Sequence, residues 1–252
     1  MIDAIPLPVH AEPAPDSLAG RVVLVTGAGQ GLGRAVAIAC ARHGATVALL
    51  GRRQEKLEES YDAIARAGHA QPAIVPLDLA AAGAPEFDAV AHLVRRELKR
   101  LDGIAHCASH FVPLGPLANQ TLEQWTTLWR VNLAAPFALT RACLPLLAAA
   151  PDSSVVFTSE THALEPRAYW GGFAVAKSGL STLAAIWADE LEHTRRPRLN
   201  VLVPGPIATP QRARSHPGEN RAALRPPESA ALAYVFLLGG ASAAISGETI
   251  AL

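Results

Sequence analysis

Short runs of apolar, often β-branched residues alternate along the chain with longer segments whose apolar positions recur at helical spacing. The short runs predict strands at 22–25, 46–50, 73–77, 103–107, 155–158, 198–203 and 248–251. The longer segments predict helices at 32–42, 57–68, 87–100, 122–147 (with a bend near Pro136), 173–192 and 230–238. This alternation predicts βαβ units and therefore a three-layer, Rossmann-like α/β fold, a doubly wound parallel sheet of about seven strands in a single domain.

Two segments fall outside the alternation. Residues 1–19 contain four prolines, no lysine and no arginine, and we expect an extended Pro-rich arm before a domain that spans 20–252. Residues 206–227 are polar and irregular. Connections this long in compact domains are usually lids or binding loops, so we expect a short lid or substrate loop there, with a passive surface loop as the alternative.

Composition narrows the classes of function. The 252 residues carry 22 Lys plus Arg against 22 Asp plus Glu, so the net charge is zero and offers no general attraction to nucleic acid or to an anionic membrane. The three cysteines are far apart and lack metal-ligand spacing, so we expect no metal. Neither a signal peptide nor an apolar run of about 18 residues is present, and we expect a cytoplasmic protein without a membrane or nucleic-acid partner.

A glycine-rich turn follows the first predicted strand. The strand runs directly into Thr-Gly-Ala-Gly-Gln-Gly-Leu-Gly at 26–33, and a helical pattern starts at once. Glycines at such a turn let the backbone approach a pyrophosphate, whose charge then lies at the helix N-terminus. The sequence therefore predicts a dinucleotide site. The residues expected to form it are Gly27, Gly29, Gln30, Gly31, Leu32 and Gly33.

The end of the second predicted strand bears on the choice of nucleotide. An NAD site needs a carboxylate there for the ribose hydroxyls, whereas a 2′-phosphate needs positive charge. This chain carries Arg52 and Arg53, and Glu55 is the first acidic residue after them. Because guanidinium groups suit a phosphate, NADP(H) is favoured over NAD(H). The alternative is that both arginines are solvated residues at a helix start.

Together these motifs resemble the short-chain dehydrogenase/reductase family. The resemblance rests on the glycine turn, Asp78-Leu79 after the third strand, Asn132 in a long helix, Lys177 in a Phe-x-x-x-Lys unit, and Pro204-Gly205 after the sixth strand. It covers nearly all of 18–252. It implies a parallel sheet in the order 3-2-1-4-5-6-7, NAD(P)-dependent redox chemistry on a small-molecule carbonyl or alcohol, and a homodimer or homotetramer.

The resemblance also assigns further positions around the cofactor. It places Asp78 and Leu79 at the adenine and Lys177 at the nicotinamide ribose. The residues that it places at the nicotinamide are Pro204, Gly205, Ile207 and Thr209.

At the catalytic positions the chain departs from the family pattern. The family uses a tyrosine four residues before the lysine as proton donor, a serine 13 residues before that tyrosine, and an asparagine that orders a relay water. Lys177 and Asn132 fit their positions, but Phe173 stands where the tyrosine is expected and Glu160 where the serine is expected. Phe173 has no proton to give, and losing a positioned acid typically lowers the rate about 10²- to 10⁴-fold.

These replacements leave several functions open. An ionised Glu160 would oppose the negative charge that develops on a carbonyl oxygen, so ordinary Tyr-dependent reduction is expected to be impaired. An active reductase would need Glu160, His162 or Tyr169 as its proton donor, while a register slip would bring Ser159 near the serine position. Glu160 could instead form an ion pair with Lys177. A non-catalytic assembly subunit is the third hypothesis.

Overall fold

A computed structural model of the chain describes residues 3–8 and 13–252. In these residues, parallel strands form one eight-stranded sheet in the order β1-β8-β7-β6-β5-β2-β3-β4. The strands are β1 (Ile5–Pro6), β2 (Val22–Thr26), β3 (Thr46–Gly51), β4 (Ala73–Pro76), β5 (Gly103–His106), β6 (Ser154–Thr158), β7 (Arg198–Val203) and β8 (Thr249–Ala251). The predicted class of fold is confirmed, and each predicted strand is found within one residue of its expected ends.

The expected number of strands is one too low, because part of the N-terminal arm joins the sheet. Ile5 and Pro6 pair in parallel with Ile250 and Ala251 of β8, so β1 is the outermost strand on that side. Proline is tolerated at such an edge because its missing N–H group faces away from the neighbouring strand. Of the predicted arm 1–19, residues 1–2 and 9–12 lie outside the described part of the chain.

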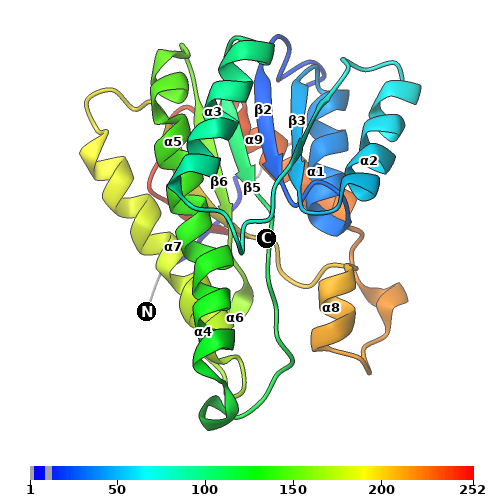
Figure 1. Ribbon diagram of the computed structural model, residues 1–252, viewed down its shortest axis with the longest axis vertical. Coiled ribbons are helices and arrows are strands. Elements are labelled where there is room, and N and C mark those ends of the chain that lie inside the picture. The colour runs from blue at the N-terminus through cyan, green and yellow to red at the C-terminus, as the bar shows by residue number, and fades with distance from the viewer. Residues whose placement is uncertain (1–2, 9–12) are drawn as a thin grey trace.

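Helices cover both faces of the sheet (Figure 1). One layer holds α1 (Gly31–Arg42), α2 (Gln54–Arg66) and α9 (Pro227–Leu238), and the other holds α3 (Ala84–Leu98), α4 (Leu122–Trp129), α5 (Ala135–Ala149) and α7 (Gly171–Glu190). Two shorter helices are α6 (Thr161–Leu164) and α8 (Pro210–Ser215). Neither short helix is predicted by the apolar periodicity, because each is only one or two turns long.

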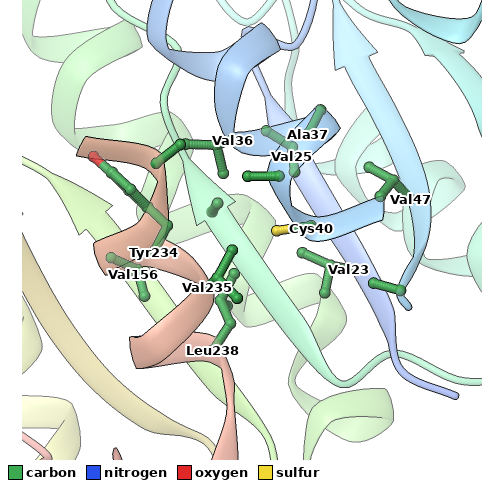
Figure 2. Close-up of a cluster of buried hydrophobic side chains, with 14 of the residues drawn as sticks. Val23, Val25, Val36, Ala37, Cys40, Val47, Val156, Tyr234, Val235 and Leu238 are labelled. Carbon is green, nitrogen blue, oxygen red and sulfur yellow. The ribbon is translucent and has the colours of Figure 1, made fainter. Parts of the chain in front are cut away.

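The two sides of the sheet bury separate apolar cores. Figure 2 shows the first, where Val36 and Cys40 of α1 and Val235 of α9 meet the strand residues Val23 and Val156. All five side chains are fully buried. Because both faces of the sheet are covered, the strands are apolar throughout rather than alternating, which is typical of parallel sheets.

The long helix predicted at 122–147 has an irregular middle. α4 continues through a π-helical segment, Arg130–Ala134, into α5, and Pro136 lies in the first turn of α5. The irregularity therefore precedes the proline, whose missing N–H group prevents a regular helical hydrogen bond there. The whole stretch Leu122–Ala149 is long and apolar enough to cross a membrane by length and composition, but half of its most apolar window is buried within the fold. A core helix passes the same test.

Candidate active site

One cavity, of about 380 Å³, lies at the carboxyl ends of the strands. In an open parallel sheet this edge is the usual place for a ligand, because the strand order reverses between β2 and β5 and the connecting loops diverge there. The predicted cofactor residues all line it, namely Gly27, Gly29, Gln30, Gly31, Leu32, Gly33, Arg52, Arg53, Asp78, Leu79, Lys177, Pro204, Gly205, Ile207 and Thr209. Glu160 and Phe173 line it as well, whereas Asn132 does not.

The glycine turn leaves room for a ligand only because side chains are absent. Gly27 has a φ of +68°, and a β-carbon on it would lie 2.9 Å from the Cα of Ala108. A β-carbon on Gly33 would lie 2.3 Å from the carbonyl oxygen of Gly27. Helix α1 begins at Gly31, so its free N–H groups face the cavity at the turn. These features fit a pyrophosphate.

The positive charge expected at the end of β3 lies beside this turn. Arg53 donates a hydrogen bond to the side-chain carbonyl of Gln30, which ties it to the glycine turn. No carboxylate of the described residues lies within ion-pair distance of Arg52. Arg52 and Arg53 both line the cavity, and Glu55 does not. This end of the cavity therefore suits a phosphate on the adenosine ribose.

Lys177 is held at the other end of the cavity by the end of β6. Lys177 is 3% exposed, and its ammonium group donates a hydrogen bond to the carbonyl oxygen of Thr158 at 2.8 Å. Burial lowers the pKa of Lys177 to about 8, while Glu160 acts in the opposite direction. The hydroxyl of Ser159 donates to the carbonyl oxygen of Lys177 at 3.0 Å, which fixes α7 against β6. Ser159 is therefore engaged with the helix rather than free for a ligand.

Phe173 lies next to this lysine, one turn earlier on α7. The ring centre is 5.9 Å from the Lys177 ammonium nitrogen, and the residue is 1% exposed. Phe173 packs edge-on against Phe111 at 5.2 Å between ring centres and lies 6.1 Å from Trp170. Three aromatic side chains thus form an apolar wall beside the lysine.

No tyrosine lines the cavity among the described residues. Tyr61 lies on α2, and Tyr169 is exposed in the loop before α7 with a φ of +76°. Tyr234 is fully buried on α9, where its hydroxyl is hydrogen-bonded to that of Thr158 at 2.7 Å. Neither Tyr61, Tyr169 nor Tyr234 is hydrogen-bonded to the Lys177 ammonium group, whose partner is the carbonyl oxygen of Thr158.

Glu160 lies at the N-terminus of the short helix α6 and faces the cavity. Its Oε1 atom is buried and has no hydrogen-bond partner. Burial raises the pKa of this carboxyl to about 7, against the opposing effect of the His162 amide and of Lys177. The ion pair with Lys177 considered from the sequence is not formed, because among the described residues no carboxylate lies within ion-pair distance of that lysine.

Asn132 lies behind the cavity wall, within the π-helical segment. Its amide donates to the carbonyl oxygens of His110 and Leu128, each at 2.9 Å. Its Oδ1 accepts from the backbone N–H of His110 at 3.1 Å and from the hydroxyl of Ser109 at 3.2 Å. The side chain thus fastens the loop after β5, which itself lines the cavity.

The other two candidate donors do not line the cavity. The ring of His162 packs 4.0 Å from that of Trp170, with a buried Nδ1 that has no partner. Burial lowers the pKa of His162. The Tyr169 side chain points into solvent on the neighbouring loop.

Several lining residues are missed by the sequence reasoning. Phe111 and Trp170 come from loops, where apolar periodicity gives no signal. Arg212 and Arg214 lie on α8, within the segment 206–227 expected to form a lid. Thr209 followed by Pro210 is a recognisable helix start and could have indicated this helix, since Thr209 accepts a hydrogen bond from the Arg212 amide.

Fold and site together define a class of protein: a dinucleotide-binding α/β protein with a lysine at the reacting end of its cavity. The chain belongs to the short-chain dehydrogenase family, whose model matches residues 21–220. Over 241 residues it is 36% identical to the uncharacterized oxidoreductase YciK of Escherichia coli K12, covering 96% of this chain and 95% of that protein.

Solved structures agree with this assignment. A short chain dehydrogenase from Pseudomonas syringae superimposes with a TM-score of 0.92 at 40% identity, covering 100% of this chain and 99% of that one. A short chain dehydrogenase from Shigella flexneri 2a, complexed with NADP, gives a TM-score of 0.91 at 35% identity, covering 94% and 99%.

Proposed function

We propose that this chain is an NADP(H)-binding oxidoreductase of the short-chain dehydrogenase family in which ordinary Tyr-dependent carbonyl reduction is impaired. One observation carries the proposal. All of the residues predicted to contact the nucleotide line a single cavity, yet the ring of Phe173 lies beside the Lys177 ammonium group. The site thus keeps the groups expected to bind a cofactor, and a phenyl ring stands where the family has its proton-donating tyrosine.

The cavity supports NADP(H) rather than NAD(H). Arg52 and Arg53 supply positive charge where a 2′-phosphate would lie, and the Shigella relative is complexed with NADP. In this proposal the turn 27–33 binds the pyrophosphate, Asp78 and Leu79 the adenine, and Lys177 the nicotinamide ribose. The residues at the nicotinamide are Pro204, Gly205, Ile207 and Thr209. When bound, the cofactor supplies or accepts a hydride at its nicotinamide ring.

Phe173 explains why ordinary turnover is impaired. A phenyl ring can neither donate a proton to a carbonyl oxygen nor form a hydrogen bond with it. The absence of a positioned acid lowers the rate of carbonyl reduction about 10²- to 10⁴-fold. In this proposal Asn132 acts indirectly, by holding the loop after β5 in place through its bonds to His110 and Ser109.

A second candidate is an active NADPH-dependent carbonyl reductase with Glu160 as proton donor. It is favoured by the position of the Glu160 carboxyl in the cavity and by its pKa, which burial raises to about 7. At that value a carboxylic acid retains its proton near neutral pH and can act as a general acid. His162 and Tyr169 are weaker candidates, because neither lines the cavity.

We also propose a cytoplasmic homo-oligomer. Five of the ten large apolar side chains that are exposed in the described part of the chain lie on helices α4, α5 and α7, where a second copy could cover them. They are Leu122, Trp129, Phe137, Val175 and Ile186. Sedimentation of the purified chain tests this, and a monomer at all concentrations would contradict it.

Binding and turnover are tested separately. NADPH is expected to raise the unfolding temperature more than NADH at equal concentration, because only the folded chain binds the nucleotide. Ketones and aldehydes offered with NADPH are expected to turn over slowly. Absence of stabilisation by either nucleotide would contradict the proposal and favour a non-catalytic assembly subunit. Rapid ketone turnover abolished by Glu160→Gln would favour the second candidate.

A further inference from the structure

The wall at the reacting end of the cavity combines three aromatic side chains with one carboxyl-bearing side chain, that of Glu160. Phe111, Trp170 and Phe173 are each at least 93% buried and contact one another. Glu160 lines the same cavity, with its Oε1 atom buried and unbonded. Two neighbouring hydroxyls are already engaged, that of Thr158 with Tyr234 and that of Ser159 with the Lys177 carbonyl.

When Glu160 is ionised, this arrangement offers an acceptor where a carbonyl substrate needs a donor. A carbonyl oxygen accepts hydrogen bonds, so it requires donors, and Phe173 offers none. An ionised carboxylate only accepts hydrogen bonds, and a buried acceptor without a partner destabilises the site. The ligand group that satisfies Glu160 is therefore a donor or a cation.

Charge development during the reaction leads to the same conclusion. Hydride addition to a carbonyl creates an oxyanion, which a neighbouring carboxylate disfavours. Hydride addition to an iminium ion creates no anion, because the hydride bonds to the carbon while the C=N π electrons neutralise the positive charge on the nitrogen. An iminium ion also needs no proton from the protein, so a phenylalanine at 173 removes nothing that this reaction requires.

We propose that the natural substrate of this site is a cationic C=N compound, an iminium ion or protonated imine with an apolar ring system, with Glu160 as its charge partner and the aromatic wall as its packing surface. The proposal rests on the proposed binding of NADPH. In the balanced step, a hydride from NADPH forms the new C–H bond, the C=N π electrons become the nitrogen lone pair, and the products are a neutral amine and NADP⁺.

Other cations near the cavity do not cancel this recognition. Arg212 is held by both carboxyl oxygens of Glu219 at 2.7 Å each, which neutralises its charge locally. Arg214 donates to the carbonyl oxygen of Phe111 and lies 5.9 Å from that ring's centre. Lys177 is anchored on the carbonyl oxygen of Thr158 and forms no ion pair with Glu160. Glu160 remains the carboxyl group at this end that has an unbonded oxygen. Aromatic rings add an attraction to a cation that neutral ligands lack.

Binding is the first test and does not depend on turnover. N-methylisoquinolinium is a stable aromatic cation, and N-methyl-1-isoquinolone is a neutral carbonyl compound built on the same two fused rings. Turnover is prevented by the use of NADP⁺, which carries no hydride to transfer. With NADP⁺ present, quenching of tryptophan fluorescence, to which Trp170 in the wall contributes, is expected to give at least about tenfold tighter binding of the cation. Glu160→Gln should remove this preference, whereas Glu165→Gln, an exposed glutamate on the same segment, should preserve it.

Turnover is the second test. N-methyl-3,4-dihydroisoquinolinium and the neutral ketone 2-tetralone are compared with NADPH, after subtraction of the rate without protein. The iminium ion is expected to be reduced faster, and Glu160→Gln should lower its kcat/KM about 10- to 100-fold, the value of one hydrogen bond to a charged group. Glu165→Gln, the control outside the cavity, should leave iminium reduction nearly unchanged.

The outcomes separate this inference from the proposed function. NADPH stabilisation is measured for every variant, so that a folding defect is recognised. Suppose that NADPH binds but N-methylisoquinolinium binds no more tightly than N-methyl-1-isoquinolone, or that 2-tetralone is the better substrate. Either result overturns the iminium proposal while the proposed function stands. If NADPH does not bind, both fail.

Discussion

The ammonium nitrogen of Lys177 lies 5.9 Å from the centre of the Phe173 ring and is anchored on the carbonyl oxygen of Thr158. The lysine is therefore positioned by β6 rather than by a neighbouring hydroxyl. Its burial against an aromatic wall lowers its pKa to about 8, so its charge is more easily lost than that of an exposed lysine. In the proposed function, this lysine can therefore contact a cofactor although no neighbouring tyrosine donates a proton.

Replacing Gly33 with alanine should damage the glycine turn. The added β-carbon would lie 2.3 Å from the Gly27 carbonyl oxygen, so the turn must shift. We expect a loss of about 1–3 kcal/mol in the free energy of unfolding, measured by urea titration, and loss of stabilisation by NADPH. Gly115→Ala is the matched control, since no atom lies within 4 Å of its added β-carbon. Equal effects of the two substitutions would contradict the prediction.

The two arginines after β3 should determine the preference for NADPH. Arg52→Gln and Arg53→Gln are each expected to weaken NADPH binding about 10- to 100-fold, the value of a charge-assisted hydrogen bond, with little change for NADH. Calorimetric titration measures both affinities. Arg66→Gln, at the far end of α2, is the control. An equal loss of affinity for NADPH and for NADH would show that the arginines do not contact a 2′-phosphate.

Stability should depend on pH through Glu160. Its pKa is raised to about 7 in the folded chain, above the ordinary value of 4.5, so the folded state binds more protons between these values. This contribution is fully present below pH 4.5 and is lost as pH rises through 7. Relative to wild type, Glu160→Gln should gain on the order of 3 kcal/mol in unfolding free energy between pH 4.5 and 8. Urea titrations at both pH values measure it, and a pH-independent difference would contradict it.

Asn132 should contribute to stability through the loop after β5. Asn132→Leu removes four hydrogen bonds and leaves the backbone groups of His110 without partners. We expect the free energy of unfolding to fall by about 2–4 kcal/mol, because each buried unsatisfied group costs roughly 1–3 kcal/mol. Ser109→Ala, which removes only one of these bonds, should have a smaller effect in the same urea titration. A neutral result for Asn132→Leu would exclude a structural role.

Much of the fold can be predicted from the sequence because its strands are buried on both faces. Runs such as 22–25 and 198–203 are apolar throughout, and the helices between them have one apolar side. The extra strand at Ile5–Pro6 carries no such signal, since two residues beside prolines show no periodicity. α8 was likewise obscured by its polar composition, although Thr209 and Pro210 mark its start.

The candidate site divides along the same line. The part of the cavity predicted to bind the nucleotide can be recognised from the sequence, because the glycine turn and the residues after β3 are short motifs of neighbouring residues. The reacting end is assembled from Phe111, Trp170 and α8, which are distant in sequence and meet only in the folded chain. Glu160, which stands at the family's serine position in the sequence, lines the cavity. Its unbonded buried oxygen is a property of packing that no motif expresses.

The central claim is that the cofactor cavity is intact and that the missing hydroxyl groups limit ordinary carbonyl reduction. The double substitution Phe173→Tyr and Glu160→Ser tests it most directly, with NADPH oxidation measured on a panel of ketones and aldehydes. We expect the kcat of the double variant to be about 10²- to 10⁴-fold higher than that of the wild type, with NADPH affinity unchanged. No increase in a variant that still binds NADPH, or rapid ketone turnover already present in wild type, would contradict it.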